Sequence, residues 1–93
     1  MTDQAQPTPP TGSDTQTDNQ KLSFGQRAVG LSFNPSGNKE VQTLKQQIAY
    51  FIDTCDQFRT AATDPEVKRM YSVAITEAQT AQMWGVKAAT WQS

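Results

Sequence analysis

Two apolar patterns of helical period, joined by only a few residues, limit what this chain can fold into. The first pattern recurs at steps of three and four. Its members are Val41, Leu44, Ile48, Phe51, Ile52, Cys55 and Phe58. The pattern predicts a helix from about 39 to 61, with Asn38 as its N-cap and Lys45 on the polar side.

The second pattern predicts a helix from about 64 to 90. Thr63 is expected to cap it, with Glu66 completing a capping box and Pro65 in the first turn. Its seam consists mostly of small side chains, which let another backbone approach closely: Val67, Tyr71, Ala74, Ala78, Ala81, Gly85 and Ala88. Bulkier residues flank this seam: Met70, Ile75, Met83, Trp84, Val86 and Trp91.

The short linker predicts an antiparallel helical hairpin and an all-α fold. Two helices enclose no interior, and domains this small rarely stabilise themselves without a disulfide, a metal or oligomerisation. The chain has one Cys and no His, which excludes a disulfide framework and a His-based metal site. We therefore expect the hairpin to assemble into a homo-oligomer.

The rest of the chain divides into two parts. Residues 1–20 hold three prolines and almost no apolar side chains, so a disordered tail is expected. Residues 21–38 are predicted to form a short extended segment and a turn, because Val29, Leu31 and Phe33 alternate with Gly30 and Ser32. The helical hairpin domain is expected to span 39–93.

Several functions find little support in the composition. The net charge is −1, and residues 21–93 carry eight bases against six acids, which is too mild for a typical duplex-binding protein. The chain has neither a signal-peptide pattern nor an apolar run of about 20 residues, so a reducing, cytoplasmic setting is expected. Cys55 lies on an apolar face and is interpreted as a core residue. We expect no catalytic residues, no metal and no cofactor.

Binding of a small anionic ligand has better support. Arg27 lies in the predicted extended segment, Lys45 on the first helix and Arg69 near the start of the second. Basic side chains beside the free N–H groups of helix starts suit phosphates. Aromatic side chains such as Phe33 and Trp84 offer surfaces on which bases could stack. Taken alone, however, a few scattered bases are more often a solvated surface, and aromatics at helical spacing are more often packing residues.

Three stretches carry a resemblance to a known family: FNPSGN (33–38), VQTLKQQIAYFID (41–53) and RMYSVAITEAQTAQMWGVKAATW (69–91). Together they resemble the phage helical-hairpin sponges, the anti-CBASS and anti-Thoeris proteins. The resemblance implies a non-enzymatic protein that forms hexamer-like oligomers. Such proteins trap cyclic dinucleotides, cyclic trinucleotides or cyclic ADP-ribose isomers between protomers, in the host bacterial cytoplasm.

The resemblance also implies a set of ligand-binding residues. Lys45 would meet the phosphate or base edge of a cyclic dinucleotide, and Arg69 with Ser72 would gather the phosphates of a cyclic trinucleotide. The remaining candidates are Arg27, Phe33, Asn34, Asn38 and Thr76. Some family members carry an aromatic residue where this chain has Gln26, which would alter the dinucleotide pocket. The FNPSGN turn points to ADP-ribose-type ligands as an alternative.

Two other interpretations remain. One is an oligomeric hairpin that acts as an assembly or protein-interaction module without a small ligand. The other is a DNA-binding regulator, against which stand the mild charge and the lack of a basic recognition helix.

Overall fold

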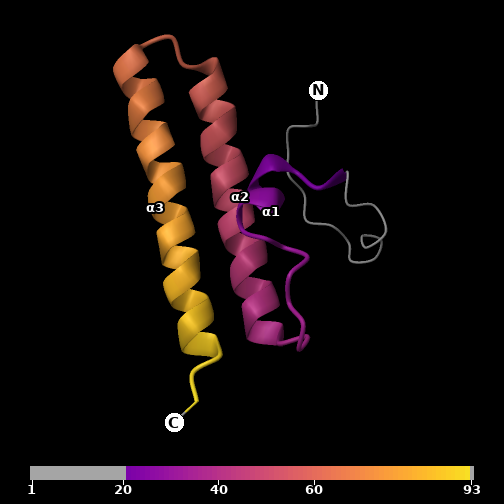
Figure 1. Cartoon of the computed structure of the whole chain (residues 1–93). Coiled ribbons are helices and arrows are strands. Elements are labelled where there is room, and N and C mark those ends of the chain that lie inside the picture. Colours follow the sequence, from indigo (N-terminus) through magenta and orange to yellow (C-terminus); the bar gives the residue numbers. More distant parts are fainter. Residues whose placement is uncertain (1–20, 93) are drawn as a thin grey trace.

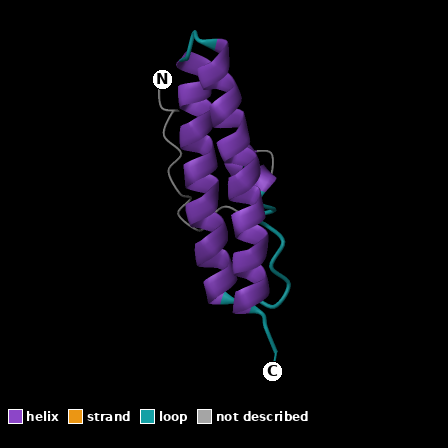
Figure 2. Ribbon diagram, turned by 90° about the vertical axis from the view of Figure 1, so that its left-hand side faces the viewer, coloured by secondary structure: helices purple, strands orange, loops and turns teal. Residues whose placement is uncertain are grey.

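The computed structural model describes residues 21–92, so the tail predicted for 1–20 lies outside the described residues. Three helices follow in order: α1 (Phe24–Ala28), α2 (Lys39–Ala61) and α3 (Pro65–Ala89). Helices α2 and α3 lie antiparallel and side by side, and α1 packs on α2 (Figures 1 and 2). The predicted antiparallel hairpin is confirmed.

The start of α2 agrees with the prediction. The Asn38 side chain accepts a hydrogen bond from the Val41 N–H at 3.0 Å, which satisfies one of the amides that the first helical turn leaves without a partner. Glu40 in the first turn and Arg59 in the last both complement the helix dipole. The helix ends at Ala61, where the backbone becomes extended at Ala62.

The N-cap of α3 is Asp64, which corrects the prediction of Thr63. The Asp64 carboxylate accepts from the Glu66 N–H at 2.9 Å. The reason lies in Pro65, whose ring disfavours helical dihedrals in the residue before it. Asp64 is accordingly extended and α3 begins at Pro65, so the cap has to be the residue directly before the proline.

The predicted extended segment is wrong, whereas the predicted turn at 34–37 is confirmed. Residues Phe24–Ala28 form α1, and a turn replaces the expected extended backbone after it. Ser23 accepts from the Gln26 N–H, and the Gln26 side chain accepts from the Ser23 N–H, so a complete capping box favours a helix here. Val29 and Leu31 are still buried, because the turns fold them onto α2.

The buried core lies where α1, α2 and α3 meet. Its members are Val29, Leu31, Ala49, Ile52, Cys55, Ile75 and Ala78. The predicted seam differs in two ways: Ile75 is buried and not at the flank, whereas Ala81 and Ala88 are exposed. Close approach of the helices is confirmed at Gly85, where a Cβ atom would lie 3.3 Å from the Leu44 side chain.

The hairpin is only one helix layer deep. The described residues extend over 46 × 31 × 15 Å, and a helix with its side chains is about 10–12 Å across. Only Ile52 is fully buried among the larger side chains described. None of the described helices is long and apolar enough to cross a membrane.

Candidate functional site

The turn between α1 and α2 is held to the start of α2 by asparagine side chains. The Asn34 amide donates to the Asn38 carbonyl at 2.9 Å and accepts from the Asn38 N–H at 3.2 Å. It also lies 3.4 Å from the Gln42 side-chain oxygen. Asn38 itself caps α2, so both predicted contact residues have structural roles in the free chain.

Lys45 is buried, which corrects its predicted place on the polar side of the helix. Its side chain is 5% exposed, and its Nζ donates to the Gly30 carbonyl at 2.9 Å and to the Phe33 carbonyl at 2.6 Å. Burial lowers the pKa of the Lys45 ammonium, because the charged form loses hydration. The two carbonyls replace part of that hydration.

Phe33 is the most exposed of the large apolar side chains described. Its ring is 71% exposed, and the Lys45 Nζ lies 5.5 Å from the ring centroid. This distance is within the range of cation–π attraction. The ring is therefore available to a flat ligand while its backbone is tied to α2.

Arg27 lies in α1 and not in an extended segment. Its side chain is exposed and donates to the Leu22 carbonyl at 3.0 Å. The side chain of the neighbouring Gln26 accepts from the Ser23 N–H as part of the capping box. In this chain Gln26 thus stabilises the start of α1.

Arg69, Ser72 and Thr76 lie on α3 at steps of three and four, which places them near one another on one side of the helix. Arg69 is exposed and pairs with Glu66, with its Nη2 2.7 Å from a carboxylate oxygen. The hydrogen bond from Arg69 lowers the pKa of Glu66, and the same bond raises the pKa of Arg69. Thr76 is exposed.

Arg59 joins this second group and was missed by the sequence analysis. Its guanidinium donates to the Ser72 hydroxyl at 2.9 Å and to Asp56 at 2.6 Å. It also lies 5.9 Å from the Phe24 ring. No local sequence signal identifies this contact, because Arg59 and Ser72 meet only through the packing of α2 on α3.

Apart from Arg27 in α1, the predicted contact residues form two separate groups in one chain. The first comprises the 30–38 turns with Lys45, and the second comprises Arg69, Ser72 and Thr76 together with Arg59. Lys45 and Arg59 are about four helical turns apart on α2, which corresponds to about 20 Å. A single chain does not bring the two groups into one cavity.

The potentially reactive side chains have structural surroundings. Asp53 accepts from the Ser23 hydroxyl and from the Gly25 N–H, the latter at 2.7 Å, which fastens α1 to α2. Cys55 is buried, and desolvation raises the pKa of its thiol against the opposing effect of Arg59. A raised pKa disfavours the nucleophilic thiolate. In residues 21–92 no group of acidic or Cys residues could hold a metal ion.

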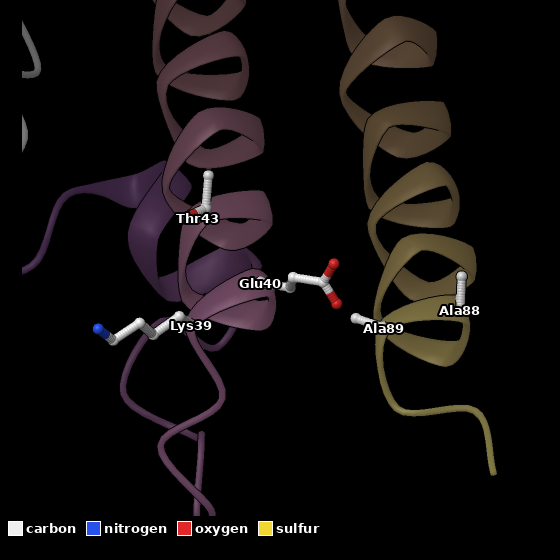
Figure 3. Close-up of a pocket in the computed structure, with 5 residues that line it drawn as sticks. All are labelled: Lys39, Glu40, Thr43, Ala88 and Ala89. Carbon is white, nitrogen blue, oxygen red and sulfur yellow. The ribbon is translucent and has the colours of Figure 1, made fainter.

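An open cleft lies between the start of α2 and the end of α3, at the end of the hairpin away from the α2–α3 linker. Five residues line it: Lys39, Glu40, Thr43, Ala88 and Ala89. Figure 3 shows the Glu40 carboxylate directed toward Ala89, whereas the Lys39 side chain points away from α3. None of the predicted contact residues lines this cleft, so it is distinct from both groups.

Comparison with known proteins gives one finding. Residues 26–90 match the family model described as "Acb2/Tad1, hairpin domain". No curated protein and no solved structure matches the chain. The matched segment begins in α1 and ends one residue beyond α3.

Proposed function

Because the chain belongs to the Acb2/Tad1 hairpin-domain family, the phage anti-CBASS and anti-Thoeris sponges, we propose that it sequesters a cyclic nucleotide messenger without degrading it. The ligand would be a cyclic dinucleotide, a cyclic trinucleotide or a cyclic ADP-ribose isomer. Holding this messenger in the cytoplasm of the infected bacterium would prevent activation of the defence effector.

The extent of the family match carries this proposal. The segment 26–90 contains every predicted ligand-binding residue, from Arg27 to Thr76. The two groups of contact residues also have suitable chemistry, since one offers an exposed aromatic ring and amides and the other offers exposed Arg69 beside hydroxyls. Bases stack on aromatic rings, and guanidinium groups suit phosphates.

Self-association is part of the proposal. A body one helix layer deep has no room to enclose a nucleotide, so the walls of a pocket would come from neighbouring copies. Many large apolar side chains of a single chain are exposed to solvent, as expected of a subunit that associates with other copies. These exposed side chains are Phe24, Phe33, Tyr50, Phe51, Phe58, Met70, Val73, Met83, Trp84 and Trp91.

The test is a thermal-shift panel with cyclic di-AMP, cyclic tri-AMP and cyclic ADP-ribose, combined with mass determination in solution. A ligand present at 100 times its Kd stabilises the folded state by about 2.7 kcal/mol, so at least one of the three should raise the melting temperature by several degrees. Unchanged melting with all three, for an assembled protein, would favour the assembly module without a small ligand.

A substitution at Arg69 separates ligand binding from folding. Arg69→Gln should weaken one ligand class by about tenfold to a hundredfold, because charge-assisted bonds to phosphate are among the stronger polar contacts. The matched control is Lys68→Gln, which removes the same charge from the adjacent exposed residue, whose Nζ contacts the Arg59 carbonyl. Calorimetry that gives equal affinities for both variants would remove Arg69 from the site.

A further inference from the structure

We propose that Lys45 is a positioning residue: its ammonium fixes the Gly30–Phe33 turn, so that the Phe33 ring is held outward as a preformed surface for an aromatic base. This inference rests on the proposed function, since it assigns a role within the same site. It differs from a direct contact between Lys45 and the ligand, which the family resemblance implies.

The first support is that one ammonium binds both ends of a single turn. The Phe33 N–H donates to the Gly30 carbonyl at 2.9 Å, which closes the turn. Lys45 Nζ donates to that same Gly30 carbonyl and also to the carbonyl of Phe33. Gly30 adopts a φ of 65°, a left-handed conformation that glycine tolerates. The turn is thereby clamped at its first and last residues.

The second support is the contrast in exposure between the two side chains. Lys45 is 5% exposed and Phe33 is 71% exposed, so a ligand arriving from solvent meets the ring. The ammonium under this ring also restrains its orientation by cation–π attraction. A ring held in place before binding loses less conformational entropy when a base stacks on it.

The neighbouring turn is held by other residues, which provides an internal reference. The Gly37 N–H donates to the Asn34 carbonyl at 2.9 Å, and the Asn34 side chain bonds to Asn38. None of these bonds involves Lys45. Loss of the ammonium should therefore release the Gly30–Phe33 turn and leave the 34–38 turn in place.

The first experiment needs no ligand. Hydrogen exchange of the Phe33 and Gly37 amides is measured in the full chain carrying Lys45→Met, with Lys39→Met as the control. Met keeps an unbranched apolar stem without the ammonium, and Lys39 is an exposed lysine of the same helix. We expect Lys45→Met to speed exchange at Phe33 by about tenfold or more, because the turn opens locally. Exchange at Gly37 should change little, and Lys39→Met should alter neither amide.

The second experiment separates positioning from contact by a double-mutant cycle. Affinity for cyclic di-AMP, cyclic tri-AMP and cyclic ADP-ribose is measured for Lys45→Met, Phe33→Leu and the double variant. If Lys45 acts through the ring, each single change weakens binding, and the double variant binds as Phe33→Leu does. If Lys45 instead contacts a phosphate directly, the losses of binding free energy in the two single variants should add up in the double variant. The affinity of Lys45→Met should then also depend less on salt concentration than that of the wild-type chain.

Three results would overturn the assignment. They are unchanged exchange at Phe33 in Lys45→Met, additive losses in the cycle, and unfolding of the whole hairpin in that variant. If the wild-type chain binds none of the three nucleotides, the proposed function fails, while the exchange experiment still decides whether Lys45 holds the turn.

Discussion

Replacing Ile52 with alanine is expected to lower the free energy of unfolding by about 3–4 kcal/mol, within the range measured for large-to-small changes in cores. Ile52 is the fully buried large side chain of the described residues, at 0% exposure. It lies in the cluster that joins α1, α2 and α3, and a thin hairpin has few other buried groups to compensate. Urea unfolding followed by circular dichroism, at one fixed protein concentration, measures the effect.

A graded series provides the control for this prediction. Ile52→Val removes one methylene group and should cost only about 0.5–1.5 kcal/mol. The protein concentration is held constant because association adds to the apparent stability. A midpoint for Ile52→Ala equal to that of Ile52→Val would show that the core does not depend on the volume of this side chain.

Gly25→Ala should lower the free energy of unfolding by about 2–3 kcal/mol, because the added methyl group overpacks a tight contact. A Cβ atom at this position would lie 2.2 Å from the Ala49 carbonyl oxygen and 3.0 Å from Asp53 Cγ. Backbone atoms of α2 cannot move aside as a flexible side chain can, so α1 has to shift away. Loss of amide protection in residues 24–33 by hydrogen exchange would report this displacement.

The same substitution at Gly85 serves as the reference. There the added Cβ would meet the end of the Leu44 side chain at 3.3 Å, which can adjust, and alanine is favoured over glycine within a helix by about 0.8–1 kcal/mol. We therefore expect Gly85→Ala to be close to neutral. Equal destabilisation by the two variants would contradict the assignment of a tight contact to Gly25.

The long helices were predictable because their signals are local. Apolar spacing and the Asn38 cap define α2, and Pro65 marks the start of α3. The sequence does not predict helix α1, since the alternation of Val29, Leu31 and Phe33 favours an extended segment over residues 21–38. The capping box of Ser23 and Gln26 was the competing local signal, and packing of the turns on α2 accounts for the buried residues.

The candidate site was less predictable, because its contacts join distant residues. Periodicity placed Lys45 among polar side chains, but the chain folds back across α2 and covers it with the Gly30–Phe33 turn. The bond between Arg59 and Ser72 depends on the pairing of α2 with α3. The ligand-binding roles themselves remain predictions that the binding experiments will test.

The depth of the single helix layer, 15 Å, bears on how much of such a protein would be needed to remove a messenger. Under the proposed function, a subunit this thin would contribute only part of the wall around a nucleotide, and a site that holds its ligand without turnover would be used once. The amount of messenger removed would then be proportional to the number of subunits made, and it would not increase further with time. Short chains that assemble, as proposed, would meet this stoichiometric demand with few residues synthesised per captured molecule.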